Sequence, residues 1–502
     1  MSESDPTSAP TNPDGVPWRE RTVPWPLRSA PLYGPEFTRD PLAYYETLRR
    51  DFGPIAPVTL DEEGTFRGYL VLDHVYQLEV LRNHGQVWAR NSRWYRDLAE
   101  GTLPLDHPLV PQIAYRRHRL YADGAEHTRM AAAGNQALGE LDLVRVRDLI
   151  EALAHQLIDA FLPGAQDKTE DQPEDGAESE APTPPAEELQ VDILADYALP
   201  LPLLVMMRLA GMNEDSALAT GTAIHELLSG GPEAARAAAE LEELMGALVA
   251  EKRDRPGPDL VSWILHHNRD SGLDEQQLRE EVWLQIVVGR GASTTWTCNT
   301  LLELLSNDDL YSDVLANRCS MDEAMNHVMW VNAPVQNLFG YWATQPTKLG
   351  PYRLDQGDMA IVSLGSSGMT MRAAGLDVSR TNNAHLAWGA GEHGCPARDL
   401  GRLIVRTGLE VLWDRLPGIE LAVPKEKLTW DLPYMARTPT ALPVTFPRPS
   451  AEPKDAARWT RDTTPFTSSP PLPTSTETRE QPSERPGRLP LWRSLVAWWP
   501  RR

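Results

Sequence analysis

The chain has 502 residues, a formal net charge of −23 and only three cysteines. Its length suits one large catalytic domain or about two to three small ones. The acidic balance argues against a general nucleic-acid-binding protein, for which a basic surface is the usual requirement. Cysteines that are few and scattered exclude a disulfide framework and a structural zinc site, so we expect a cytoplasmic protein.

Residues 1–36 are rich in proline and small polar residues, which predicts a loosely ordered arm that drapes over the domain. They lack the basic start and apolar core of a secretory signal. The ordered domain is predicted to begin near Pro41, where Asp40 precedes an amphipathic helix. A short strand is predicted at 68–72, followed by a helix at 74–82.

Residues 164–188 carry nine acids against one lysine and almost no large apolar side chain. Such a segment cannot bury enough surface to offset its ordering entropy, which predicts a disordered acidic insertion between helices. The apolar run at 197–211 contains Pro200, Pro202 and Arg208 and is shorter than the roughly 20 residues that a bilayer requires. It is therefore predicted to be a buried helix.

A long helix is predicted from Asp274 through Leu305, because Asp274 is a plausible N-cap with Gln277 three residues later. Its centre reads Gly289-Arg290-Gly291-Ala292-Ser293-Thr294-Thr295.

A glycine-rich run near the carboxyl end contains the third cysteine and reads Trp388-Gly389-Ala390-Gly391-Glu392-His393-Gly394-Cys395, with Leu400 and Arg402 following. Glycine tolerates positive φ and close approach of other atoms, so this pattern suits a tight loop that presents one cysteine. A free cysteine is most often a small buried hydrophobe. The surrounding loop favours a metal ligand instead.

The loop resembles that of the cytochrome P450 superfamily, whose pattern is aromatic-Gly-x-Gly-x-His/Arg-x-Cys-x-Gly-x-x-Leu-Ala-Arg, and it departs from that pattern at Ala397 and Gly401. The segment 191–202 also resembles the family, and the similarity covers about residues 40–446. It implies a mainly α fold with small β-sheets, in which residues 37–447 form a single large domain with a long helix over haem b. It also implies that Cys395 is the iron ligand, with Trp388, Gly389 and Gly391 in the haem-binding loop.

The resemblance further implies haem-propionate contacts from His393 and from the Glu126-His127-Thr128-Arg129 run, of which His127 and Arg129 are the candidates. Capping of a surface helix is the alternative role for that run. Two arginines that the family usually supplies are missing, because their positions hold Ala131 and Tyr341.

On the long helix the family has Ala-Gly-x-acid-Thr, in which the acid and the threonine relay protons. Aligned without gaps, Ser293 takes the place of the acid and Thr294 that of the threonine, and Arg290 faces the iron. In the alternative, a one-residue shift turns Arg290 away and makes Ser293 the relay hydroxyl. Thr294 is otherwise a mid-helix threonine that bonds to a carbonyl.

The family's Glu-x-x-Arg pair, which braces the haem-binding core, is replaced by His327-Val328-Met329-Trp330. Losing both members of a buried ion pair together is tolerable, whereas losing one leaves an uncompensated charge. This departure resembles a minority group of actinobacterial, streptomycete-type members that lack the motif. Relatives in that group often lie in operons with GTPase-type signalling proteins.

The expected function is that of a monooxygenase inserting one oxygen atom of O2 into a small organic substrate. No fused flavin or iron–sulfur domain is recognisable, so ferredoxin and ferredoxin reductase are the implied electron donors. The rival hypothesis is a catalytically degenerate haem-binding sensor or scaffold in a GTPase-type signalling assembly. Its support is Ser293, Arg290, Ala131, Tyr341 and the absent ion pair.

Three further segments carry expectations of their own. The basic island 115–119 is a candidate docking site for an acidic ferredoxin, or else a solvated cluster. Residues 448–488 are a predicted Pro/Ser/Thr-rich linker. Residues 489–502 combine tryptophans with arginines, which suits a membrane surface, a partner groove or a frayed tail.

Overall fold

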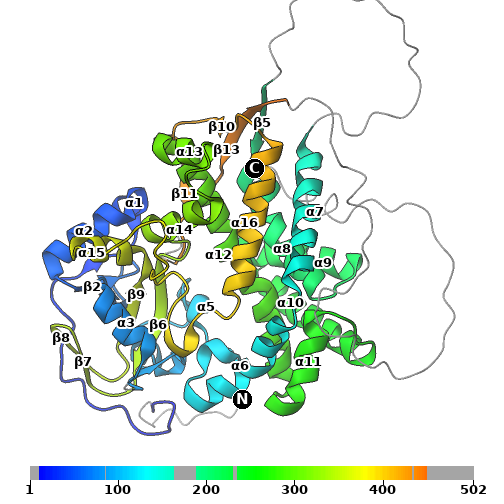
Figure 1. Ribbon diagram of the computed structural model, residues 1–502. Helices are drawn as coiled ribbons and strands as arrows, with labels where there is room; N and C mark the ends of the chain where they lie inside the picture. Colours follow the sequence, from blue (N-terminus) through cyan, green and yellow to red (C-terminus); the bar gives the residue numbers. More distant parts are fainter. Residues whose placement is uncertain (1–10, 85, 163–187, 230–233, 432–434, 449–502) are drawn as a thin grey trace, which may run out of the picture.

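The computed structural model of the chain describes residues 11–84, 86–162, 188–229, 234–431 and 435–448 (Figure 1). The predicted acidic insertion, the 448–488 linker and the 489–502 segment lie outside these residues. The exceptions are Glu188, the last residue of the insertion, and Arg448, the first residue of the linker. The described part of the chain is mainly α-helical with small β-sheets and forms a single domain.

The α-helices in chain order are α1 (Gly34–Arg39), α2 (Pro41–Phe52), α3 (His74–Arg82), α4 (Arg96–Ala99), α5 (Val110–Ile113), α6 (Gly124–Gly139), α7 (Leu143–Phe161), α8 (Pro200–Leu209), α9 (Glu214–Ser229), α10 (Ala234–Asp254), α11 (Leu260–Ser271), α12 (Glu275–Ser306), α13 (Asp308–Leu315), α14 (Met321–Val331), α15 (Ser367–Ala373) and α16 (Arg398–Arg415). The strands are β1 (Ala30–Pro31), β2 (Ile55–Thr59), β3 (Arg67–Val71), β4 (Trp88–Ala89), β5 (Glu188–Asp192), β6 (Asn337–Ala343), β7 (Thr347–Leu349), β8 (Tyr352–Leu354), β9 (Met359–Ser363), β10 (Glu420–Leu421), β11 (Trp430–Asp431), β12 (Thr438–Pro439) and β13 (Pro443–Pro447).

Six strands form the main sheet in the order β1-β2-β3-β9-β6-β4, with α1, α2, α3 and α15 around it (Figure 1). The predicted helix after Asp40 is confirmed as α2, and the Asp40 carboxylate accepts a hydrogen bond from the Ala43 amide at 3.1 Å. This N-cap satisfies a backbone donor that the helix itself leaves unpaired. Buried Tyr45 and Leu48 then turn the apolar face of α2 toward the sheet.

The other part of the molecule consists of helices α6 to α12 and α16, whose apolar faces share one large core. The predicted buried helix at 197–211 corresponds to a π-helical turn at Leu194–Ala198 followed by α8. No helix of the described residues is both long and apolar enough to cross a bilayer.

The long helix α12 links the two parts of the molecule. Its predicted start is confirmed by a capping box, because the Asp274 carboxylate accepts from the Gln277 amide and the Gln277 side chain accepts from the Asp274 amide. The helix packs against α8, α10, α14 and α16 and contacts β12. These contacts fix its rotation and therefore decide which side chains it presents.

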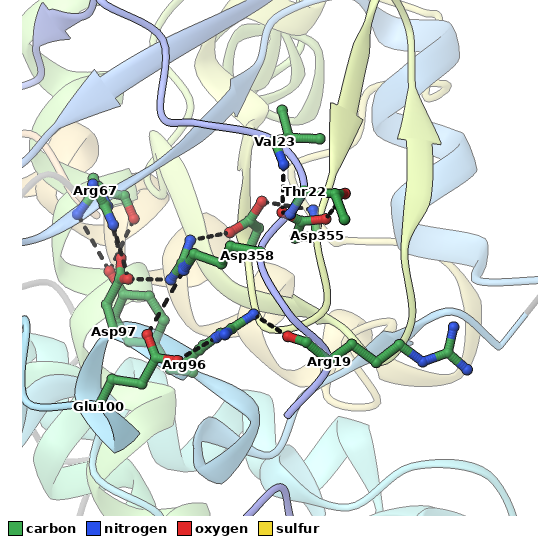
Figure 2. Close-up of polar contacts among 11 residues, drawn as sticks. Arg19, Thr22, Val23, Arg67, Arg96, Asp97, Glu100, Asp355 and Asp358 are labelled. Atoms are coloured by element: carbon green, nitrogen blue, oxygen red, sulfur yellow. Dashed lines mark hydrogen bonds and ion pairs between the residues drawn. The ribbon is translucent and has the colours of Figure 1, made fainter. Parts of the chain in front are cut away.

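The amino-terminal arm lies against the sheet over its described part. Trp25 packs edge-on against Tyr69 at 5.1 Å between ring centroids, and Trp18 packs edge-on against Trp94 at 6.0 Å. Arg21, Thr22 and Val23 bond to buried aspartates between these tryptophans (Figure 2). These contacts hold the described part of the arm, residues 11–36, against the domain.

Candidate functional site

The glycine-rich loop runs from Trp388 to Cys395 and leads into α16. Gly391 has φ +72° and an added Cβ there would lie 2.3 Å from the Leu81 carbonyl oxygen, so only glycine fits this position without strain. The Cys395 amide donates to the Trp388 carbonyl at 2.8 Å. This bond closes the loop and holds the cysteine at the start of α16.

The Cys395 thiol is partly exposed and lies in a mixed electrostatic environment. Burial raises the pKa of Cys395, whereas the Ala397 amide, Arg119 and Arg398 act to lower it. A metal ligand must be the thiolate, so the two arginines favour the binding form. Cys298 and Cys319 are buried in packed cores, which is the ordinary fate of a free cysteine.

Two histidines that the resemblance assigns to one ligand do meet in the structure. The rings of His127, on α6, and His393 are 4.4 Å apart between centroids. Burial, followed by His393 and Arg119, lowers the pKa of His127 to about 4. Both ring nitrogens of His393 are buried and find no hydrogen-bond partner within the described ranges. The carboxylates of Asp123 and Glu392 lie 3.5 and 3.6 Å from Nε2 of His393, too far for a good hydrogen bond, so the His393 ring can still accept a better-placed partner.

The third candidate, Arg129, does not join this group. Its Nη1 donates to the carbonyls of Ser271 and Gly272 at 3.1 and 3.2 Å, at the carboxyl end of α11. A cation is stabilised there by the helix dipole and by the unpaired carbonyls of the last turn. The prediction that Arg129 contacts a cofactor is therefore corrected to a capping role.

Arg90 lies beside Tyr341, which occupies a position where the family usually has an arginine. The sequence analysis did not predict this contact. The Arg90 guanidinium lies 4.4 Å from the centre of the Tyr341 ring. Its Nη1 bonds to the carbonyls of Phe339 and Gly340, and its Nε is buried without a partner in the described chain. Arg90 thus brings a positive charge to β6 from 249 and 250 residues before its two carbonyl partners.

The centre of α12 has one open face. Val288 is 47% exposed, and Gly289, Gly291 and Ala292 are exposed as well. An added Cβ at Gly289 or Gly291 would meet nothing within 4 Å. The neighbouring side of the helix carries Trp296, whose ring packs edge-on against Trp388 of the cysteine loop at 5.3 Å. The open face therefore lies next to the loop that presents Cys395.

The structure does not place Thr294 on this face. Thr294 is 3% exposed, and its hydroxyl donates to the Ala198 carbonyl at 3.0 Å, before α8. Ser293 is also buried, and its hydroxyl donates to the Gly289 carbonyl at 3.2 Å. Neither hydroxyl points into open space. The alternative in which Thr294 simply bonds to a carbonyl is the one that the geometry supports.

Arg290 is turned away from the open face. At about 100° per residue, it lies about 160° around the helix from Val288. Its side chain is buried, its Nε finds no partner in the described chain, and burial lowers the pKa of Arg290 to about 10. Arg290 therefore lies as in the alternative that turns it away, on a helix that packs against α8 and α10.

Thr295 is the hydroxyl that the sequence analysis missed. It lies within about 20° of Val288 around the helix axis. Its Oγ1 donates to the Gly291 carbonyl at 3.1 Å and lies 2.6 Å from Oγ1 of Thr438, on β12. Thr295 is itself buried, at 2% exposed, and because its single hydroxyl hydrogen goes to Gly291, Thr438 is the donor in the contact between the two hydroxyls.

Neutral groups brace α14 in place of the expected ion pair. Asn326 donates to the carbonyls of Arg380 and Asn382 at 2.7 and 2.8 Å, and the Trp330 indole donates to the same Asn382 carbonyl at 2.8 Å. The His385 ring lies 3.0 Å from Asn326 Oδ1 and packs edge-on against Trp330 at 5.7 Å. Helix α14 is thus tied to the 380–385 loop without a buried charge.

His327, at the position of the family's glutamate, faces α12 instead. Its Nε2 lies 3.7 Å from Oε1 of Glu303. Interaction with His327, followed by the side-chain amide of Asn307 and by Lys425, lowers the pKa of Glu303 to about 2. The carboxylate at this contact therefore belongs to α12 rather than to α14.

The basic island at 115–119 is neutralised by the first turns of α12. Arg116 pairs with Glu280 at 2.7 Å and stacks on Trp283 at 4.1 Å from the ring centre. Arg117 pairs with Asp274 at 2.6 Å, and buried Arg119 lies 3.4 Å from Glu281. The expectation of a free basic docking patch is not supported, because these arginines already have acidic partners.

Comparison with known proteins gives a consistent picture, although no family model matches the chain. It is 25% identical to the cytochrome P450 monooxygenase PikC of Streptomyces venezuelae over 85% of this chain and 96% of that protein. It is 30% identical to nocardicin C N-oxygenase of Nocardia uniformis subsp. tsuyamanensis over 51% of this chain and 66% of that enzyme. The structure of CYP154C4 from Streptomyces sp. W2061 superposes with a TM-score of 0.69 and 26% identity, covering 83% of this chain and 98% of that one.

Proposed function

This chain belongs to the cytochrome P450 superfamily of haem-thiolate monooxygenases, and we propose that it holds haem b through Cys395 and oxygenates a small organic substrate. One atom of O2 enters the substrate, and ferredoxin with ferredoxin reductase supplies the electrons. The observation that carries the proposal is the meeting of Cys395, His393 and His127 beside the open face of α12. The free thiols suit a cytoplasmic setting.

The residues around Cys395 fit a haem. The unpartnered nitrogens of His393 suit a propionate carboxylate, and the open space at Gly289 and Gly291 leaves room for a flat ring against α12. Asp123 and Glu392 lie 3.5 and 3.6 Å from Nε2 of His393 and would repel a propionate. We therefore assign Arg90 the cationic part that Ala131 and Tyr341 do not supply.

Bound through a cysteine thiolate, haem supplies the oxygen chemistry, because the thiolate donates electron density that favours O–O cleavage. The chain supplies the position of that thiolate through the Cys395–Trp388 backbone bond. It also supplies a proton path in which Thr438 Oγ1 and Thr295 Oγ1, 2.6 Å apart, carry a proton to the open face. Thr294 holds Ala198 and stays outside this path.

The rival function, a degenerate sensor or scaffold, loses part of its support. It depended on a cation at the iron and on the lack of a relay hydroxyl. Arg290 is turned away from the open face, and the buried hydroxyl of Thr295 lies on the side of α12 that carries this face. The absent ion pair is matched by a neutral brace.

Substrate-dependent oxygen consumption tests the proposal. The full chain is mixed with a ferredoxin, its reductase, NADPH and each member of a panel of small organic compounds. Nocardicin C is tested first, because one relative is a nocardicin C N-oxygenase. We expect one panel member to raise oxygen consumption and to yield an oxygenated product by mass spectrometry. Haem uptake without turnover by any donor or compound would contradict the monooxygenase proposal and favour the sensor.

A further inference from the structure

Residues 91–122 connect β4 to α6, and the residues that flank the two ends of this segment are in contact. The Arg90 amide donates one bifurcated hydrogen bond to the Asp123 carboxylate, with both oxygens at 3.0 Å. Segments that connect the regular elements of a fold often carry function. We call residues 91–122 the excursion.

One side of the excursion is held by α12. The pairs Arg116–Glu280, Arg117–Asp274 and Arg119–Glu281 all join the end of the excursion to the first turns of that helix. Glu280 and Glu281 lie within about two turns of Val288, where the open face begins. The excursion therefore lies beside the approach to the open face.

The other side of the excursion is held by the amino-terminal arm, as Figure 2 shows. Asp97, on α4, accepts a bidentate pair from Arg67 of β3 at 2.8 and 3.0 Å, and it also accepts from Arg21 of the arm. Arg96 donates to the Arg19 carbonyl at 2.7 Å. The side chain of Asp97 is only 5% exposed, so these charge-assisted bonds are shielded from water.

The arm is itself anchored on the turn between β8 and β9. Asp355 accepts from the amides of Thr22 and Val23 at 2.8 and 2.9 Å and from the Thr22 hydroxyl at 2.8 Å. Arg21 reaches Asp358 at 3.1 Å as well as Asp97 (Figure 2). Arg21 therefore joins a rigid turn of the sheet to the first helix of the excursion.

We propose that the arm is a strap that holds the excursion closed through Arg21 and thereby limits ligand access to the open face of α12. The strap joins α4 to the sheet, and α12 holds the opposite end of the excursion. Arg67 also ties Asp97 to the sheet, so loss of the strap weakens this attachment and lowers the cost of opening the excursion about its contacts with α12. Such local openings commonly gate a buried site. The access part of this inference rests on the proposed haem site, whereas the strap itself does not.

Hydrogen–deuterium exchange of the full chain tests the strap without requiring haem. The reporters are the amides of Ala99, Glu100 and Leu103, which bond to carbonyls within α4 and its flanks. We expect Arg21→Ala to speed their exchange about tenfold, because the charged bonds from Arg21 to Asp97 and Asp358 are lost. Arg19→Ala is the matched control, since it removes the same charge from the same arm, and Figure 2 draws no contact to its guanidinium.

Trp18→Ala is a second variant in case Arg21→Ala does not fold, because it removes the ring that packs on Trp94. We expect the same local acceleration in residues 92–103. Wild-type exchange there, or an equal acceleration through the whole fold, would overturn the strap.

The access part is measured separately, as the rate at which imidazole shifts the Soret band of the haem-loaded protein. We expect a faster rate for Arg21→Ala than for Arg19→Ala. Faster exchange at 92–103 with an unchanged imidazole rate would overturn the access part. Failure of every variant and of the wild type to take up haem would count against the proposed function, and the exchange result would stand.

Discussion

Trp330→Arg is expected to lower the free energy of unfolding by about 3–5 kcal/mol, because it places a charge in a buried site without a charged partner. Trp330 is 3% exposed, and its indole bonds to a neutral carbonyl at Asn382. The family's arginine depends on a glutamate that this chain lacks. Urea denaturation at neutral pH measures the difference.

Trp330→Phe is the control for this prediction, since it keeps an aromatic ring and loses only the indole hydrogen bond, at a cost of about 1 kcal/mol. Adding His327→Glu to Trp330→Arg restores the family pair in sequence, but we expect little recovery. A carboxylate at position 327 would face Glu303, which lies 3.7 Å from the present imidazole. Wild-type stability in the single arginine variant would contradict the neutral brace.

Thr295→Ala is expected to reduce product formation per oxygen consumed by about 100-fold, the lower range for loss of a positioned proton-transfer group. This loss is expected because the buried hydroxyl of Thr295 lies on the side of α12 that carries the open face and contacts Thr438. Product and oxygen are quantified in the same reaction with the ferredoxin system.

Two variants separate a relay from a structural role. Thr295→Ser keeps the hydroxyl and is expected to restore most of the yield. Thr294→Ala removes the bond to Ala198 and is expected to cost about 1 kcal/mol of stability while the yield is kept. A low yield in Thr294→Ala beside a normal yield in Thr295→Ala would show that the sequence alignment, and not the helix rotation, assigns the relay.

Local signals in the sequence predict the elements well. Asp40 and Asp274 each supply an N-cap whose geometry depends only on neighbouring residues, and α2 and α12 begin where those caps predict. The cysteine loop is likewise set by its own glycines. Such features are readable because cause and effect lie within a few residues.

The rotation of α12 is not a local property. Neighbouring hydroxyls at Ser293, Thr294 and Thr295 differ by about 100° steps around the helix, so packing against α8 and β12 decides which one faces open space. Arg90 was missed for a related reason, since its partner Tyr341 is remote in sequence. In the arm, Arg21 pairs with Asp97 and Asp358, which are also remote in sequence. The proline-rich composition of the arm gives no sign of these contacts.

The most direct test of the haem-thiolate assignment is the absorption spectrum of the purified full chain, reduced with dithionite and exposed to carbon monoxide, beside Cys395→Ala. We predict a strongly red-shifted Soret band in the wild type and its loss in the variant, because the thiolate of Cys395 is the assigned iron ligand. A band typical of neutral or nitrogen ligation in the wild type, or the same red-shifted band in both proteins, would contradict the assignment.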